Sequence, residues 1–452
     1  MTKLLFQDFE KITSKQWKQL IQYELKGADY NDTLVWESLE GIKVKPFYHR
    51  DEDALQLPIS SPNGFSIVQP IFVHDVEKSN ARAIETLQRG AESLYFTLSN
   101  TEIAPDELLK NIPLEGKSIF FNCTFLDVDT LQRYEQYAQA KKATFYYLND
   151  PVGQLMKDGN WFENLTEDMK KLNHFQQLGI KNYLAIDTTV VQNAGGNMVQ
   201  QLAYGLAHAH EYVHHVDTLP ETLVIQTAVG SNYFFEIAKN RAFRWMLESY
   251  FTSMGLQTHI VFLTTPSKRN KTLYDYNVNM LRTTTECMSA ILGGSDFVMN
   301  LPYDALYHKD NEFGDRISRN QLLILKHESY FNEVFNASEG SYYIENLTKQ
   351  LAEKGLELFK ELEKNGGLIT QLIEGTIQRK IEDNAEKELQ LFASGKEVLV
   401  GTNKYPNPQD RMKNDLELYP FVKTQARKTL IKPIIAKRWA ETLEQDRLAQ
   451  ES

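Results

Sequence analysis

Cysteine is scarce in this chain: Cys123 and Cys287 are the only two among its 452 residues. Two thiols so far apart in sequence form no disulfide framework, so a reducing, cytoplasmic compartment is expected. The chain also lacks any run of 18 apolar residues, which excludes a transmembrane helix at the level of sequence. The first 17 residues include acidic side chains and no apolar core segment, so no signal peptide is predicted.

A basic excess is missing as well. The 49 lysines and arginines face 60 aspartates and glutamates, for a net charge of −11. Such a chain cannot neutralise phosphates over a broad surface, which argues against nucleic acid and an anionic membrane as partners. The 42% hydrophobic content is ample for a large core, and the length fits two or three domains or one barrel with additions.

Short apolar runs alternate with longer amphipathic segments from about residue 65. Continuous apolar character without strict alternation is typical of strands that are covered on both faces, as in parallel sheets. Eight such runs over roughly 240 residues favour an α/β fold, a (β/α)8 TIM barrel, over a doubly wound open sheet. The predicted strands are Ser66–Phe72, Ser93–Leu98, Ser118–Cys123, Ala143–Leu148, Asn182–Asp187, Thr222–Val229, Gln257–Leu263 and Asp296–Leu301.

Helical spacing of apolar residues predicts the segments that surround and follow these strands. Four regions are expected: an N-terminal arm for subunit contact (1–60), the barrel (61–310), a C-terminal helical extension (311–400) and a charged tail (401–452). The predicted helices are Asp8–Leu25, Val76–Gly90, Asp129–Lys142 with Asp129 as its N-cap, Met198–Val213, Tyr233–Met254, Tyr274–Leu292, Asp315–His327, Tyr342–Lys364 and Ile369–Ser394. The acidic stretch Glu382–Glu388 is expected to be a solvated helix face.

One short motif suggests metal chemistry. His210-Glu211-Tyr212-Val213-His214 matches H-E-x-x-H, in which two histidines one helical turn apart ligate zinc and the glutamate is a general base. His208 and His215 lie beside it. Because no third ligand follows at a recognisable spacing, a surface histidine cluster is the preferred interpretation, and His210 and His214 remain the candidate metal ligands.

Several longer motifs occur in a fixed order, and together the chain resembles the cobalamin-dependent acyl-CoA mutases, the methylmalonyl-CoA mutase family. The resemblance covers nearly the whole chain and rests on order more than on any single motif. The motifs are Glu40-Gly41-Ile42, Gln192-Asn193-Ala194-Gly195-Gly196, Phe235-Glu236-Ile237-Ala238-Lys239, Arg282-Thr283-Thr284, Leu292-Gly293-Gly294, Arg316-Ile317-Ser318-Arg319-Asn320 and Gly340-Ser341-Tyr342-Tyr343.

The departures from that family are concentrated at its catalytic positions. The resemblance implies a Tyr-His pair after strand five, where the His donates to the thioester carbonyl, and this chain has Thr189 and Val190. An isopropyl group cannot donate a hydrogen bond. Family polar positions in strand four become Tyr146 and Leu148, and those after the strand-eight helix become Asp296 and Met299. No Asp-x-His-x-x-Gly cobalt-ligand motif occurs in the sequence, so the tail (401–452) is expected to contain no cobalamin-binding domain. Bulky Tyr146, Leu148, Val190 and Phe297 are expected to fill the substrate channel.

These departures resemble the non-catalytic small subunits of heterodimeric members of the family. The implied partner is a catalytic large subunit, which binds adenosylcobalamin and interconverts methylmalonyl-CoA and succinyl-CoA, while this chain itself binds no cofactor. Residues 1–48 and the helices after residue 315 are the expected contact surfaces. Two alternatives stay open: an active acyl-CoA mutase substrate subunit whose cobalamin domain is on a separate chain, and a metal-dependent hydrolase that uses His210, Glu211 and His214.

Overall fold

The computed structural model describes residues 8–52, 57–423 and 427–451, and its centre is an eight-stranded parallel sheet. The strands follow the order β6-β5-β4-β3-β10-β9-β8-β7, so each one pairs with the neighbour that a barrel requires. Each predicted strand is present, with ends shifted by a few residues at most. The strands are β3 (Ser66–Val73), β4 (Ser93–Leu98), β5 (Ser118–Cys123), β6 (Thr144–Tyr147), β7 (Leu184–Asp187), β8 (Thr222–Val229), β9 (His259–Pro266) and β10 (Phe297–Val298).

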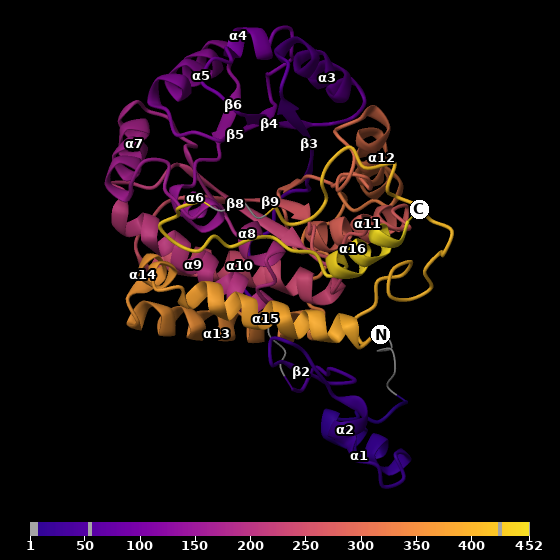
Figure 1. The fold of residues 1–452 in the computed structure, drawn as a ribbon. Coiled ribbons are helices and arrows are strands. Elements are labelled where there is room, and N and C mark those ends of the chain that lie inside the picture. Colours follow the sequence, from indigo (N-terminus) through magenta and orange to yellow (C-terminus); the bar gives the residue numbers. More distant parts are fainter. Residues whose placement is uncertain (1–7, 53–56, 424–426, 452) are drawn as a thin grey trace.

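Backbone hydrogen bonds join the two edge strands of this sheet. The Tyr147 amide of β6 donates to the carbonyl of Asn182, just before β7, at 2.8 Å. The Ala185 amide of β7 donates to the carbonyl of Asn149, just after β6, at 3.0 Å. These bonds satisfy edge groups that an open sheet would leave unpaired. The fold is therefore a nearly closed TIM-like barrel surrounded by helices, as the sequence predicted (Figure 1).

Helices cover the outside of the barrel between successive strands. Asp127, not the predicted Asp129, caps α5, because its carboxylate accepts from the Thr130 amide three residues on. Two helices between β6 and β7 were not predicted, although Asp150-Pro151 is a strong start signal. The helices are α3 (Val76–Gln88), α4 (Pro105–Leu108), α5 (Val128–Lys141), α6 (Pro151–Asp158), α7 (Leu165–Gln177), α8 (Thr189–Asn193), α9 (Met198–His215), α10 (Tyr233–Ser253), α11 (Val278–Leu292) and α12 (Glu312–Leu323), continued by a π-helical turn (Ile324–Glu328).

The helices of the N-terminal arm project beyond the C-terminal helices and away from the barrel (Figure 1), whereas its hairpin packs on the barrel layer, where the Trp36 ring meets Phe235 of α10 edge-on at 5.6 Å. The arm contains α1 (Ser14–Glu24), α2 (Tyr30–Leu34) and an antiparallel pair, β1 (Trp36–Glu37) and β2 (Lys43–Val44). Trp17 stacks on Phe47 with ring centroids 4.3 Å apart. The two short strands form a hairpin, whose turn includes Gly41 at φ +67°.

Three helices follow the barrel and lie along its outer layer. Helix α13 (Tyr342–Lys364) packs against α9 and α10. The single helix predicted for 369–394 is wrong: α14 (Gly367–Ile373) and α15 (Thr376–Ala393) are separated at Gly375. Gly375 has φ +73°, a conformation that breaks an α-helix and favours glycine.

Residues 397–423 and 427–440 form an irregular strap that runs over the C-terminal ends of the barrel strands (Figure 1). Its backbone bonds to Met156 after β6, Asn193 after β7 and Arg269 after β9. The strap ends in α16 (Glu441–Gln450), a helix that the sequence did not predict. In the part of the chain that the structure describes, no helix is long and apolar enough to cross a bilayer.

Candidate functional site: the interior and mouth of the barrel

The interior of the barrel is a packed apolar layer to which all eight strands contribute. Residues that alternate inward along a strand meet on the barrel axis, where TIM barrels stack side chains in layers. Phe120 is fully buried, stacks on Tyr146 with centroids 4.8 Å apart, and meets Phe297 edge-on at 4.9 Å. The layer consists of Val68, Tyr95, Phe120, Leu148, Ala185, Val224, Val261, Leu263 and Phe297, with Tyr146 and Met299 packed against it.

The structure places the predicted site residues in different environments. Tyr146, Leu148 and Phe297, which were expected to fill the channel, lie in this interior layer together with Met299. Val190, on α8, was expected beside them and belongs instead to the main hydrophobic core.

Thr189 and Asp187 lie at the C-terminal mouth. The Thr189 hydroxyl and amide both donate to the Asp187 carboxylate, at 2.5 and 2.9 Å. Burial raises the pKa of Asp187, and the nearby Asp150 carboxylate adds to that shift. The hydroxyl at the family's tyrosine position is therefore committed to an intramolecular bond.

Asp296 has a structural role at the opposite end of the barrel. Its carboxylate pairs with Arg244 at 2.6 Å and accepts from the Phe262 amide at 2.7 Å. Its own carbonyl accepts from the Ser66 amide. Asp296 therefore ties α10 to β3 and β9 at this end of the barrel, just before β10 begins.

Asp150, three residues after the end of β6, is likewise bound by other residues of the fold. The buried Asp150 carboxylate contacts His208 Nε2 at 2.7 Å and accepts from the Tyr212 hydroxyl at 2.5 Å and the Asp187 amide at 2.8 Å. Burial alone would raise the pKa of Asp150, but His208 and these donors hold it below its usual range. His208 is thus a buried partner of Asp150 and does not belong to a surface histidine cluster.

The retained family motifs form buried ion pairs around the barrel. In the FEIAK segment, Lys239 contacts the Glu236 carboxylate at 2.5 Å and donates to Gln201 at 3.0 Å. Two residues on, Arg241 reaches Glu345 of α13 at 2.7 Å. Arg319 of the RISRN segment donates to Gln69 of β3 at 3.0 Å. These motifs hold the helical layer on the barrel.

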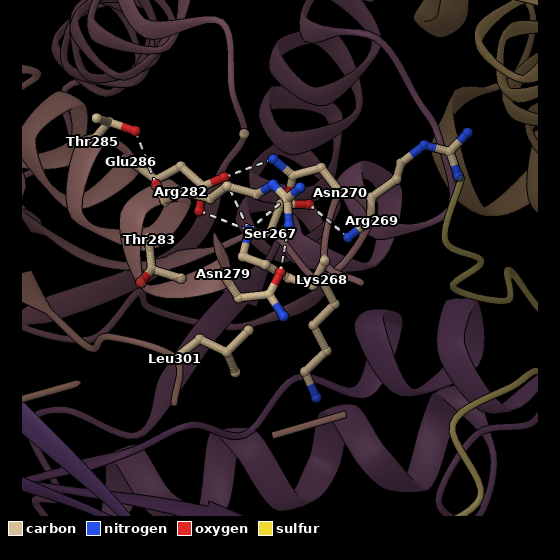
Figure 2. A network of polar contacts seen from close by, with 12 residues as sticks. Ser267, Lys268, Arg269, Asn270, Asn279, Arg282, Thr283, Thr285, Glu286 and Leu301 are labelled. Atoms are coloured by element: carbon tan, nitrogen blue, oxygen red, sulfur yellow. Dashed lines mark hydrogen bonds and ion pairs between the residues drawn. The ribbon is translucent and has the colours of Figure 1, made fainter. Parts of the chain in front are cut away.

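A second buried network follows β9, and sequence reasoning did not find it (Figure 2). Lys271 Nζ lies 2.8 Å from Glu286 of α11, and Asn270 donates to the same carboxylate at 2.7 Å. Arg282 extends the network to Asn279 at 2.8 Å and to the carbonyl of Val400 in the strap. Burial lowers the pKa of Lys271 and raises that of Glu286, while their attraction opposes both shifts. The sequence carries one signal for this network: Arg282, the first residue of the Arg282-Thr283-Thr284 motif, lies one helical turn before Glu286.

The HEYVH segment does not assemble a metal centre. His210 Nδ1 contacts the Tyr250 hydroxyl at 2.6 Å, whereas His214 Nδ1 bonds to the backbone carbonyl of His210 at 2.9 Å. Glu211 accepts from the Ile369 amide of α14. Among the residues that the structure describes, no three His, Cys, Asp or Glu side chains gather closely enough to hold a metal.

Glu363 of α13 faces this histidine pair and should make stability pH-dependent. Burial, with Glu211 nearby, raises its pKa to about 7 against the partial opposition of His214. Since the folded carboxyl keeps its proton up to a higher pH than the unfolded one, its contribution to stability falls as pH rises from about 4.5 to about 7. Glu363→Gln should therefore gain stability relative to the parent chain between pH 5 and pH 8, as measured by urea unfolding. Glu353→Gln, on an exposed part of α13, should leave the pH dependence unchanged; equal pH dependence of the parent and Glu363→Gln chains would contradict the assignment.

The chain is similar in sequence to known proteins of one family. The family model described as Methylmalonyl-CoA mutase matches residues 103–449, and the chain belongs to that family. The methylmalonyl-CoA mutase small subunit of Porphyromonas gingivalis is 31% identical over 442 residues, covering 89% of this chain and 71% of that protein. The methylmalonyl-CoA mutase of Cereibacter sphaeroides is 30% identical, covering 86% of this chain and 64% of that protein. The human mitochondrial methylmalonyl-CoA mutase is 27% identical, covering 86% of this chain and 60% of that protein.

Proposed function

We propose that this chain is a non-catalytic subunit of a heterodimeric methylmalonyl-CoA mutase. Its partner would be a large subunit that binds adenosylcobalamin and interconverts methylmalonyl-CoA and succinyl-CoA. The observation that carries the proposal is the packed aromatic layer inside the barrel, built around Phe120, Tyr146 and Phe297. The similarity to a protein named as a small subunit supports the same role.

The residues inside the barrel do not suit a CoA thioester or a radical reaction. A pantetheine arm carries amides that need hydrogen-bond partners when they are buried, and the interior layer offers mainly aromatic and aliphatic surface. The family's thioester-binding histidine is replaced by Val190, which packs in the outer core. No catalytic step is therefore assigned to residues of this chain, and cobalamin chemistry would belong to the partner.

The same observations weigh against the two alternatives. An active substrate subunit would need a polar channel, whereas three aromatic rings meet on the barrel axis. A metal-dependent hydrolase would need a third ligand beside His210 and His214, but the described residues bring no third His, Cys, Asp or Glu to them, and Glu211 accepts from the Ile369 amide. Co-expression with the large subunit tests the proposal: a stoichiometric complex on size-exclusion chromatography is expected, and two separate peaks would contradict it.

The N-terminal arm offers the surface for that partner. Leu20 and Tyr23 on α1 are exposed by 54% and 83%, and Ile12 just before the helix is also exposed. Exposed apolar side chains gathered on one element mark protein interaction sites. Helix α1 also projects away from the barrel, where a second chain could surround it (Figure 1).

Charging this apolar helix face should weaken the complex. The double variant Leu20→Glu/Tyr23→Glu should bind the large subunit at least about tenfold more weakly, because a buried carboxylate at an interface is costly. Its thermal stability should stay close to that of the parent chain, since both side chains are already exposed. Leu281→Glu changes an apolar residue of α11 that is 68% exposed, and serves as the matched control. Equal affinities of the control and the double variant, measured by calorimetry, would exclude α1 from the interface.

A further inference from the structure

A cavity of about 330 Å³ lies beside the barrel mouth, at the ends of β8 and β9. Its walls come from three parts of the chain that are distant in sequence: the hairpin of the arm, the barrel loops and the C-terminal segment. Trp36 and Glu40 supply the first wall, Gln192 belongs to the second, and Glu397 and Trp439 supply the third. Its volume is within the range of small-molecule sites.

Acidic side chains dominate this cavity, and two of them have no cationic partner. Of the four glutamates in the wall, Glu236 pairs with Lys239, and Glu388 pairs with Arg269 at 2.5 Å. The other two are Glu40, which accepts a 3.4 Å bond from the Met198 amide and a hydrogen bond from the Ser38 side chain, and Glu397. Within residues 8–52, 57–423 and 427–451, no lysine or arginine forms an ion pair with either carboxylate.

The environment of these two carboxylates disfavours their ionised form. Burial raises the pKa of Glu40, and burial together with the neighbouring Glu388 raises the pKa of Glu397. A bound cation would reverse both shifts, because an opposite charge within a few ångströms stabilises the ionised carboxylate. The cavity is therefore built to gain from a positive charge.

A buried acceptor in the wall points to the same ligand. Gln192 is 8% exposed, and its side-chain oxygen Oε1 has no hydrogen-bond partner among the described residues. An N–H donor is what that oxygen lacks. Trp36 and Trp439 add indole rings, whose faces attract cations. An anion would meet the unmatched glutamates. Arg269 already neutralises Glu388 through Nε and donates to the Lys437 carbonyl through Nη1, and only its Nη2 has no partner among the described residues.

We propose that this cavity binds a small aliphatic amine, whose ammonium groups are held by Glu40 and Glu397. A diamine supplies one ammonium group for each unmatched carboxylate. Because the walls include the arm hairpin and the C-terminal segment, the bound amine would join both to the barrel. The site is independent of the proposed subunit role, since it uses neither the barrel interior nor α1.

The test is calorimetric titration of the full chain with 1,4-diaminobutane, with the uncharged 1,4-butanediol as a matched ligand. The diamine should bind with a stoichiometry of one, and the diol should not bind. Glu40→Gln and Glu397→Gln should each weaken diamine binding by at least about tenfold, because each removes one desolvated charge partner. Glu353→Gln lies outside the cavity and should bind as the parent chain does.

A second readout follows from the protonated state of the glutamates. At pH 5 the diamine should displace protons from the cavity glutamates. The observed binding enthalpy should therefore depend on the ionisation enthalpy of the buffer that takes up these protons. Glu397→Gln should reduce that dependence. Absent diamine binding, equal binding of the diol, or affinities that the Glu40 and Glu397 substitutions leave unchanged would each overturn the proposal. The last result would show only general attraction of amines to a chain of net charge −11.

Discussion

Lys271→Met should cost about 3–5 kcal/mol of unfolding free energy, because it leaves the Glu286 carboxylate buried without its cation. Both side chains are 1% exposed, and their charged atoms lie 2.8 Å apart. Asn270 would remain as a donor to Glu286, but an amide cannot neutralise a charge. The free energy should be measured by urea unfolding at neutral pH, where Glu286 must either stay ionised at high cost or take up a proton.

The matched control is an exposed lysine in an ion pair. Lys170→Met removes a pair with Glu167 whose side chains are 65% and 40% exposed, and should change stability by less than about 1 kcal/mol. The double variant Lys271→Met/Glu286→Leu should recover part of the loss, because no charge is then left buried. Similar losses for Lys271→Met and Lys170→Met would mean that the network in Figure 2 contributes little to stability.

Phe120→Ala should cost about 3–5 kcal/mol, which is the range for truncating a buried phenylalanine in a packed core. Phe120 is fully buried and contacts the rings of both Tyr146 and Phe297. Removing it opens an apolar void on the barrel axis, and such voids bind small apolar molecules. We therefore expect benzene to raise the melting temperature of Phe120→Ala and to leave that of the parent chain unchanged.

Phe72→Ala provides the comparison within the same barrel, because Phe72 is at the end of β3 and 52% exposed. Its replacement should cost less than about 1 kcal/mol, since little area is returned to water. If both substitutions had the same small effect, the barrel interior would be loosely packed. The packing would then give no argument against space for a substrate.

The barrel could be predicted from sequence because its strands are buried on both faces. Runs such as Ser93–Leu98 and Thr222–Val229 were identified to the residue, because uninterrupted apolar character between turns is a local signal. The break at Gly375 was missed because apolar spacing continues from α14 into α15, and the glycine alone carries the signal. Helix α16 was missed because its stability is tertiary: the buried Glu444 accepts from the Leu273 amide and from Arg438.

The candidate site was harder to predict, because alignment to a motif gives neither orientation nor partners. Tyr146 and Met299 follow strand alternation, so their position inside the barrel could be foreseen. Val190 starts a new helix and Asp296 precedes its strand, so alternation does not apply to either residue. Glu388, expected on a solvated face, is bound by Arg269 and by the Trp439 indole at 3.1 Å. Those partners are 119 and 51 residues away and could be recognised only from the fold.

The side chains inside the barrel and the polar residues around it have different roles. Side chains on the axis pack against one another, whereas the polar residues of the family motifs, among them Arg241 and Lys239, bind the helices to the strands. In this barrel the apolar side chains fill the axis, and the polar motif residues are used to hold the helices. The proposed non-catalytic role rests on that combination.

Mutase turnover with adenosylcobalamin, measured for this chain alone, for the large subunit alone and for their mixture, tests this account most directly. We predict no conversion of methylmalonyl-CoA by this chain alone, and conversion by the mixture that is unaffected by Phe120→Ala once the variant is shown to be folded and bound. Cobalamin-dependent turnover by this chain alone would contradict the account.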